Sequence, residues 1–260
     1  MNVVIDIGNS NVVVGVYCDG QLSHIWRIPT KTNVEVNHYK LEVVKLMFEA
    51  NVDIYEIDYA VLSSVVPDLT RPFVDFLSDF LKTDVIVVGP EIYGHLELTL
   101  SKPNEIGSDL VANAYAAITR YKRDSIVIDF GTALTVLAVG NDWQLHGVSI
   151  APGIKTALKS LNINTAKLPE VPLNLPESVL GLDTVHAIQS GVLIGYIGLV
   201  EKLVARYKSE WNPEAIVIAT GGLNHVLDPL RKLFYEVHPN LTLDGLCAIG
   251  RKVIASRANG

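Results

Sequence analysis

Short apolar runs and longer amphipathic segments alternate along the chain. Three Val- and Ile-rich runs at 3–7, 11–17 and 21–28 are separated by the turn formers Gly8-Asn9-Ser10 and Asp19-Gly20, which predicts three consecutive strands in a meander. Further strands are predicted at 58–65, 84–88, 126–129, 134–140, 144–151 and 214–219, and helices at 36–50, 69–82, 107–122, 154–161, 183–208, 223–234 and 243–257. Because strands alternate with helices, the pattern predicts an α/β fold with mixed sheets.

The second set of three strand-like runs repeats the first at an offset of 123 residues. Residues 4–8 (VIDIG) align with 127–131 (VIDFG), and ten identities fall within the 26 positions 4–29. Average composition would give about two. The aligned pairs outside the first run include Val13 with Val136 and Val16 with Val139. The chain is therefore predicted to contain a duplicated lobe.

The lobe boundary is expected just before the second repeat begins. We assign 1–117 to an N-terminal lobe and 118–260 to a C-terminal lobe. Within the second lobe, three prolines in the stretch 168–176 exclude regular helix or central strand and predict a structured loop or arm.

Composition narrows the classes of protein. With 260 residues, 49% of them hydrophobic and 19% charged, the chain can bury a sizeable core, which excludes a disordered protein. A formal net charge of −7 argues against a general nucleic-acid binder.

Cysteine usage and the N-terminus suggest a compartment. Cys18 and Cys247 make no metal-ligand spacing and are expected to be buried apolar residues of a protein in a reducing cytosol. No signal-peptide pattern opens the chain, and the longest apolar stretch, 191–200, is shorter than the roughly 20 residues of a membrane helix. A soluble, cytoplasmic protein is expected.

Two turns of the repeat carry residues that suit a phosphate. Residues 6–11 (DIGNSN) and 129–135 (DFGTALT) each place small and hydroxyl or amide residues after a buried aspartate, where backbone N–H groups can approach an anion. An ordinary hairpin would explain either turn alone. Two such turns in pseudo-symmetric lobes would instead face each other across a cleft and grip one nucleotide.

A third turn follows the predicted strand 214–219. Thr220-Gly221-Gly222 lacks side-chain bulk, so a ribose or flat ring could lie against the backbone at the start of the next helix. A tight strand–helix turn is the alternative.

Taken together, the motifs resemble those of type III pantothenate kinases. They are, in chain order, residues 6–11, Gly107-Ser108-Asp109, 129–135, Pro152-Gly153, Asp183-Thr184 with Gln189-Ser190-Gly191, and Thr220-Gly221-Gly222. The resemblance covers essentially the whole chain. It implies two duplicated ribonuclease-H-like lobes of the actin-like ATPase superfamily, with mixed five-stranded sheets and an interlobe cleft. It also implies ATP-dependent phosphorylation of pantothenate, the first step of coenzyme A synthesis.

The resemblance also implies roles for individual residues. The first phosphate loop would comprise Asp6, Ile7, Gly8, Asn9, Ser10, Asn11, Val12 and Val13, with Asp6 facing the Mg²⁺ of Mg-ATP. Thr132, Gly221 and Gly222 would contact ATP, and Asp129 would bind a monovalent cation, K⁺ or NH₄⁺. Pantothenate would meet Leu100, Gly107, Ser108, Asp109 and Leu110, together with Thr184 from the neighbouring subunit of a homodimer.

Asp109 is the expected general base. Phosphoryl transfer needs an acceptor for the hydroxyl proton, and a carboxylate in the first turn of a helix should remain ionised beside the helix dipole. Asp109 could also serve as a helix N-cap, and the two roles are compatible.

Two positions depart from the family pattern. Leu110 stands where an arginine is usual and Leu100 where a tyrosine is usual, and a leucine cannot form a charge-assisted bond to the pantothenate carboxylate. Lys102 is a candidate source of the missing charge. Two alternatives therefore stay open: a kinase of another small hydroxy acid, and a non-catalytic nucleotide-binding regulator on the same scaffold.

Oligomeric contacts have one sequence signal. Gly191, Gly195 and Gly198 share one face of the predicted helix 183–208, which permits close approach of another helix. Packing within the chain would explain that face, and the family resemblance favours a homodimer contact.

Overall fold

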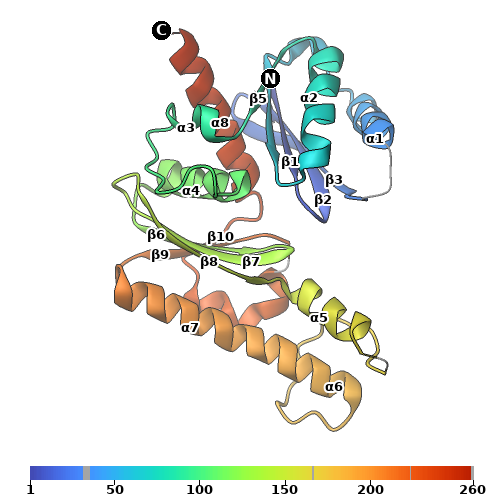
Figure 1. The fold of residues 1–260 in the computed structure, drawn as a ribbon, viewed down its shortest axis with the longest axis vertical. Helices are drawn as coiled ribbons and strands as arrows, with labels where there is room; N and C mark the ends of the chain where they lie inside the picture. Colours follow the sequence, from blue (N-terminus) through green and yellow to red (C-terminus); the bar gives the residue numbers. More distant parts are fainter. Residues whose placement is uncertain (32–35, 166, 223, 259–260) are drawn as a thin grey trace. The chain divides into compact units, whose positions relative to one another are not determined.

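The protein comprises two compact units, each built on its own five-stranded sheet. The computed structural model describes residues 1–31, 36–165, 167–222 and 224–258 (Figure 1). The first unit is Met1–Arg120 with Leu241–Gly260, and the second is Tyr121–Asn240.

The first sheet has the strand order β3-β2-β1-β4-β5. Its strands are β1 (Asn2–Ile7), β2 (Asn11–Cys18), β3 (Gln21–Pro29), β4 (Tyr59–Ser64) and β5 (Asp84–Val87). The central strand β1 pairs antiparallel with β2 and parallel with β4. Val3, Val4, Ile5 and Ile7 of β1 are all fully buried, because helices cover both faces of the sheet.

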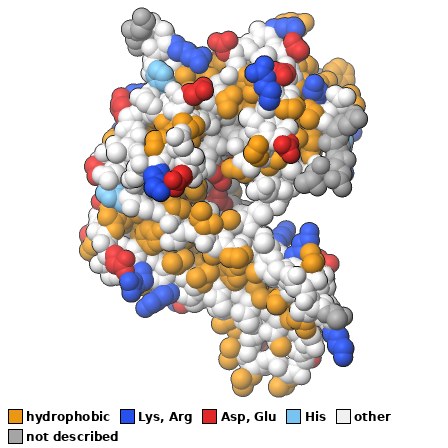
Figure 2. Space-filling view, in the orientation of Figure 1, with side chains coloured by type: hydrophobic (Ala, Val, Ile, Leu, Met, Phe, Trp, Pro, Cys, Tyr) orange, Lys and Arg blue, Asp and Glu red, His pale blue; other side chains and the backbone are white. Residues whose placement is uncertain are grey.

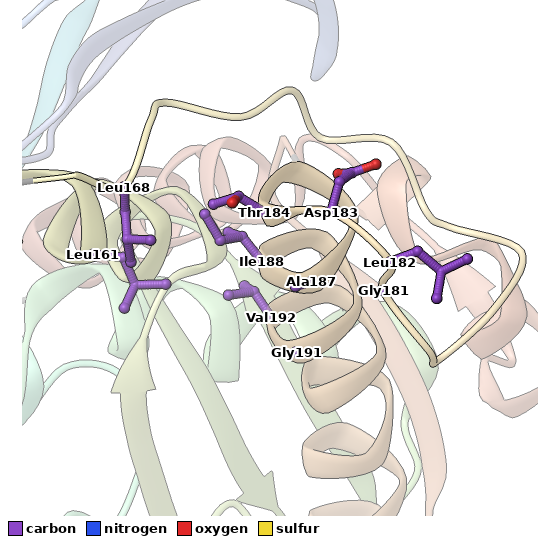
Figure 3. Close-up of a pocket in the computed structure, with 10 residues that line it drawn as sticks. All are labelled: Leu161, Leu168, Gly181, Leu182, Asp183, Thr184, Ala187, Ile188, Gly191 and Val192. Atoms are coloured by element: carbon purple, nitrogen blue, oxygen red, sulfur yellow. The ribbon is translucent and has the colours of Figure 1, made fainter.

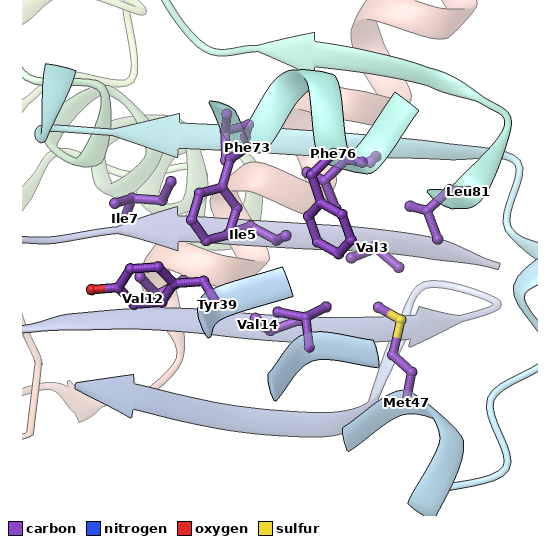
Figure 4. Close-up of a cluster of buried hydrophobic side chains, with 14 of the residues drawn as sticks. Val3, Ile5, Ile7, Val12, Val14, Tyr39, Met47, Phe73, Phe76 and Leu81 are labelled. Atoms are coloured by element: carbon purple, nitrogen blue, oxygen red, sulfur yellow. The ribbon is translucent and has the colours of Figure 1, made fainter. Parts of the chain in front are cut away.

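Helices α1 (Val36–Glu49) and α2 (Pro67–Leu81) cover one face of this sheet. Figure 4 shows Phe73 and Phe76 of α2 lying over the side chains of β1, with Tyr39 and Met47 of α1 beside β2. The remaining elements of the unit are a 3-10 turn (Ile54–Glu56), α3 (Pro90–Tyr93), α4 (Ser108–Tyr121) and α8 (Leu241–Ala258). Helix α8 packs on β1 and β4 on the other face of the sheet.

The second sheet has the order β10-β9-β6-β7-β8, which is the same topology as the first. Its strands are β6 (Ser125–Phe130), β7 (Ala133–Val139), β8 (Leu145–Pro152), β9 (Ile216–Thr220) and β10 (Glu236–Val237). Here β6 pairs antiparallel with β7 and parallel with β9. The predicted duplication is thus confirmed in the fold.

Helices of the second unit are α5 (Ile154–Ile163), α6 (Thr184–Gln189), a π-helical turn (Ser190–Ile194), α7 (Gly195–Glu210) and a 3-10 helix (Asn224–Leu233). Figure 1 shows α7 running along one face of the sheet. Leu193, Val200 and Val204 lie in the core there with Ile126, Ile128 and Val217.

The register refines the sequence alignment of the two repeats. In the first unit Ile7 pairs with Val12, whereas in the second Phe130 pairs with Leu134, so the second turn is one residue shorter. Strand β7 therefore corresponds to β2 at an offset of 122, and Val136 is the counterpart of Val14. The alignments of Val13 with Val136 and Val16 with Val139 are wrong by one residue.

The C-terminal helix α8 lies in the first unit and not, as predicted, in the second lobe. Residues 241–258 were expected in the second lobe, yet α8 belongs to the first unit. Gly245 and Gly250 explain why α8 packs there: a Cβ at Gly245 would overlap the backbone of Ala112 in α4, and one at Gly250 would lie 2.5 Å from Val61 Cγ2 in β4. Only glycine allows this close helix approach.

The other predicted elements differ from the structure in detail. The predicted helix 183–208 is interrupted by the π-turn, and the predicted helix 223–234 is a 3-10 helix whose first predicted residue, 223, lies outside the described residues. The proline-rich stretch 168–176 is irregular, as expected.

Among the described residues, one helical segment, Thr184–Glu210, is long and apolar enough to cross a membrane by length and composition. The helix also packs on the second sheet through Leu193, Val200 and Val204, as the core helix of a globular domain does. The composition of this segment alone is therefore weak evidence of a membrane span.

Candidate functional site

The first predicted phosphate turn is held by hydrogen bonds of its own backbone. The amide of Gly8 donates to the carbonyl of Asn11 at 2.9 Å, and the Thr30 hydroxyl donates to the carbonyl of Gly8 at 2.7 Å. Asn9 and Ser10 are exposed at the tip, whereas Ile7, Val12 and Val13 are buried in paired strands. The exposed part of this predicted loop is therefore its tip, Asn9 and Ser10, flanked by the partly exposed Gly8 and Asn11.

Asp6 ends the buried strand β1 and lies beside the predicted pantothenate turn. Ser63 of β4 donates to Asp6 Oδ1 at 2.9 Å, and the same Ser63 hydroxyl lies 2.9 Å from the Ser108 hydroxyl at the start of α4. Ser63 and Ser108 are both buried. Ser63 thus links Asp6 to the Gly107–Leu110 turn within the first unit.

Asp109 is half-buried in the first turn of α4. Its Oδ1 accepts a hydrogen bond from the Leu110 amide at 2.9 Å. Burial raises the pKa of this carboxyl above its ordinary value, although backbone N–H groups act in the opposite sense. Burial, which the sequence does not reveal, is therefore the dominant effect on the Asp109 pKa. A raised pKa makes the carboxylate of Asp109 a stronger base.

The absence of a side chain at Gly107 leaves room for the carboxylate of Asp109. A Cβ built there would overlap Oδ1 of Asp109, so any side chain would displace the carboxylate from its present position. The predicted turn is therefore shaped around the carboxylate of Asp109.

The two leucines that replace family residues lie near Asp109 in sequence but offer no charge. Leu110 is buried, and Leu100 is half-buried. Lys102, the candidate substitute cation, is exposed and lies 3.0 Å from Glu105, which neutralises much of its charge. Tyr93 of α3 is buried near Asp109: burial, and secondarily the Asp109 charge, raise the pKa of Tyr93 to about 12.

Hydrogen bonds within the second unit hold the second phosphate turn. The carbonyl of Thr132 accepts from the Gly153 amide at 2.9 Å and from the Thr156 hydroxyl at 2.7 Å. A Cβ at Gly153 would overlap the carbonyls of Gly131 and Thr132. Pro152-Gly153 thus lies directly against the turn, which explains why glycine occurs there.

Gly221 brings the third turn against Asp129. Its φ is +87°, and a Cβ there would lie 2.5 Å from Asp129 Oδ1 and 2.7 Å from the Phe130 amide nitrogen. Thr220, the last residue of β9, pairs with Asp129 in the parallel ladder. Asp129, Thr132 and Gly221 therefore gather at one edge of the second sheet. Gly222 is exposed beside them.

Thr184 lies elsewhere in the second unit, at the exposed start of α6. Asp183 caps this helix by accepting from the His186 amide at 2.9 Å. A hollow of about 640 Å³ is lined here by Leu161, Leu168, Gly181, Leu182, Asp183, Thr184, Ala187, Ile188, Gly191 and Val192. Figure 3 shows Thr184 with Ile188 and Val192 on the helix, facing Leu161 and Leu168.

Two buried polar residues of α6 and the following π-turn tie the proline-rich arm to this helix. Gln189 Nε2 donates to the carbonyl of Pro172 at 2.9 Å, and Ser190 Oγ donates to the carbonyl of Val179 at 2.6 Å. The arm thereby presents apolar side chains outward: Val179, Leu180 and Leu182 are exposed, Leu182 by 97%. Figure 2 shows hydrophobic side chains gathered at this end of the second unit.

Sequence reasoning missed Ser63 and Tyr93. Ser63 lies in an apolar strand with nothing to distinguish its hydroxyl, and only the parallel register of β1 and β4 reveals that it faces Asp6. Tyr93 comes from a single helical turn that lies fourteen residues before Gly107. No sequence pattern pointed to either residue.

Comparisons with known proteins point to one family. The family model described as type III pantothenate kinase matches residues 2–206. The type III pantothenate kinase of Exiguobacterium sibiricum is 39% identical over 95% of this chain and 97% of its own length. That of Desulfosudis oleivorans is 39% identical over 96% of this chain and 98% of its own length.

A solved structure extends the comparison to the fold. The activator of the 2-hydroxyisocaproyl-CoA dehydratase from Clostridium difficile, with bound ADPNP, superposes with a TM-score of 0.56 at 14% identity, covering 99% of this chain and 96% of that one. At this identity the likeness concerns the fold alone. The family model and the two relatives span nearly all the motifs described above, and the chain belongs to the type III pantothenate kinase family.

Proposed function

We propose that this chain transfers the γ-phosphoryl group of ATP to the primary hydroxyl of pantothenate, the first step of coenzyme A synthesis. The observation that carries the proposal is the hydrogen-bonded link from Asp6 through Ser63 to the turn that bears Asp109, in a chain of this family. This link joins a carboxylate suited to the phosphate side to one suited to the acceptor side. In this reading Mg²⁺ enters with ATP and supplies charge neutralisation around the phosphates.

Asp109 would accept the proton of the pantothenate hydroxyl as its oxygen attacks the γ-phosphorus. Burial favours this role, since a carboxylate that is costly to keep ionised takes up a proton more readily. The exposed tip of the first turn, Asn9 and Ser10, and the Thr132 turn would contact the phosphates, and Gly221 and Gly222 the nucleoside. Asp129 would bind K⁺ or NH₄⁺.

A coupled ADP-release assay tests the function and its cation together. We expect ADP release that depends on pantothenate and is faster in K⁺ or NH₄⁺ than in Na⁺, and we expect Asp129→Asn to abolish the difference between these ions. ATP binding without pantothenate-dependent ADP release would favour the non-catalytic regulator instead.

Kinase action on another small hydroxy acid is the second candidate, and the two leucines favour it. Leu110 is buried, Leu100 carries no charge, and Lys102 is engaged by Glu105. The same assay with pantothenol, the uncharged alcohol analogue, separates the two. A kcat/KM for pantothenol within about tenfold of that for pantothenate would mean that no cationic side chain binds the pantothenate carboxylate. A charge-assisted hydrogen bond to that carboxylate would change kcat/KM by more than about tenfold.

We also propose that the protein acts in the cytoplasm as a homodimer, with Thr184 serving the partner's pantothenate site. Cβ atoms built at Gly191, Gly195 and Gly198 meet nothing within 4 Å, so packing among the described residues does not account for this small-residue face. The exposed Leu180 and Leu182 lie on the adjoining arm. Both features suit a second copy of the chain.

Light scattering after size exclusion tests the dimer. The wild-type protein should have twice the chain mass of 28.4 kDa. Leu182→Asp should lower the mass to that of a monomer, because it adds a charge to an apolar contact. Leu41→Asp, a matched change at an exposed leucine of α1, should leave the dimer intact. A monomeric wild-type protein, or equal effects of both variants, would refute the interface.

A further inference from the structure

Ser63 is a wholly buried hydroxyl between two residues to which the proposed reaction assigns roles. It occupies the register position opposite Asp6 in the parallel pairing of β1 and β4. Its oxygen lies 2.9 Å from Asp6 Oδ1 and 2.9 Å from Ser108 Oγ. Its neighbours on the strand, Val61 and Leu62, are buried apolar side chains, so a hydroxyl here would be costly without partners.

Proton counting fixes the direction of this chain of hydrogen bonds. Ser63 donates its single hydroxyl proton to Asp6 Oδ1. Ser63 must therefore accept from Ser108. The other acceptor near the Ser108 hydroxyl is the Ser64 carbonyl at 3.5 Å, which is the longer contact. The chain runs from Ser108 through Ser63 to Asp6.

The duplicated unit has a hydroxyl residue at the same place. Thr220 pairs with Asp129 in the ladder of β6 and β9 as Ser63 pairs with Asp6, and both hydroxyl residues are buried, at 1% and 0% exposure. Each strand-end aspartate of the repeat thus has a buried hydroxyl residue beside it. The two positions share this chemistry although one is serine and the other threonine.

We propose that Ser63 is a positioning residue for phosphoryl transfer, an inference that rests on the proposed function. Through Ser108 it ties the first residue of α4, and hence Asp109, to the end of β1 that carries Asp6. The base and the carboxylate on the phosphate side are thereby held at a fixed separation. In-line transfer depends steeply on such geometry, and a misplacement of about 1 Å can cost about 100-fold in rate.

The test is a set of variants measured by steady-state kinetics and thermal unfolding. Ser63→Ala should lower kcat about 10- to 100-fold while the KM values for ATP and pantothenate change less than about threefold. Ser63→Thr should restore most of the rate, since it keeps the hydroxyl and reproduces the residue of the duplicated unit. Adding Ser108→Ala to Ser63→Ala should cost little more in Tm, because both substitutions remove the same hydrogen-bonded chain.

Ser64→Ala is the matched control. The Ser64 hydroxyl accepts from the Val66 amide at 3.2 Å and from the Thr70 hydroxyl at 2.8 Å, so its loss should lower Tm. It should leave kcat near the wild-type value, because its hydroxyl lies outside the chain to Asp6.

The outcomes separate this inference from the proposed function. A wild-type protein without pantothenate-dependent turnover would refute the proposed function. The Tm values of the single and double variants would still decide whether the hydrogen bonds from Ser108 through Ser63 to Asp6 exist. Additive Tm losses for Ser63→Ala and Ser108→Ala would contradict a shared chain of hydrogen bonds. In an active enzyme, equal losses of kcat for Ser63→Ala and Ser63→Thr would overturn the positioning role.

Discussion

Asp109→Asn is expected to lower kcat about 10²- to 10⁴-fold, which is the usual contribution of a general base. The amide keeps the size of the side chain and can still accept from the Leu110 amide, but it cannot take the proton of the acceptor hydroxyl. The dissociation constant for ATP should change by less than about threefold, because Asp109 acts on the acceptor. Rapid-quench kinetics and calorimetric titration with ATP would measure the two effects.

The raised pKa of Asp109 gives this prediction a pH signature. Turnover requires the ionised carboxylate, so kcat should fall as the pH drops through a pKa higher than that of an ordinary aspartate. Stability should change in the opposite direction. A group whose pKa is raised by folding stabilises the fold while protonated, and this contribution is lost as the pH rises through the folded-state pKa.

Asp109→Asn should therefore raise Tm at neutral pH, and the gain should disappear in acid, where the wild-type carboxyl is protonated. Glu105→Gln removes the same charge from an exposed residue of the same segment and should change neither kcat nor Tm appreciably. Near-normal turnover in Asp109→Asn would remove the base assignment. An equal loss of kcat in Glu105→Gln would mean that the local charge, and not proton transfer, causes the effect.

Gly221→Ala is expected to destabilise the second unit by about 2–4 kcal/mol and to abolish measurable ATP binding. The residue has a φ of +87°, and the added methyl would lie 2.5 Å from Asp129 Oδ1. Relief of this overlap must move Asp129 or the turn that follows β9, and both belong to the proposed nucleotide and cation site. Differential scanning fluorimetry with and without Mg-ATP would report both consequences.

Gly222→Ala is the control for stability at the neighbouring position. A Cβ at Gly222 meets nothing within 4 Å, so the same substitution should leave Tm in the absence of nucleotide unchanged. A Gly221→Ala variant with the Tm and the Mg-ATP affinity of the wild type would contradict this prediction. The close contact between the third turn and Asp129 would then contribute nothing to stability or to binding.

Much of the fold could be predicted because local patterns and topology agree. The repeated aspartate turn and the alternation of strands with helices led directly to two sheets of identical strand order. The position of α8 could not be predicted, since it depends on the close contacts of Gly245 and Gly250 with elements more than 100 residues away. The one-residue difference between the duplicated turns was also hidden, because the incorrect register matches two pairs of valines and the correct register matches only one.

The candidate site was predictable where a residue is part of a turn motif. Asp6 with Ser108, and Asp129 with Gly221, were identified from sequence and lie beside one another within their units. Ser63 could not be found in this way, since its contribution arises from pairing between strands distant in sequence. The pKa shift of Asp109 was misjudged for a similar reason. A helix dipole can be inferred from a local pattern, whereas burial requires the tertiary structure.

The central claim is that this chain phosphorylates pantothenate, and ³¹P NMR of a reaction with Mg-ATP, pantothenate and K⁺ tests it most directly. The account predicts a new phosphomonoester resonance, coupled to the methylene protons of the pantothenate primary alcohol, that grows in step with ADP and is lost in Asp109→Asn. Inorganic phosphate as the only product, or intact ATP after prolonged incubation with protein that binds it, would contradict the account.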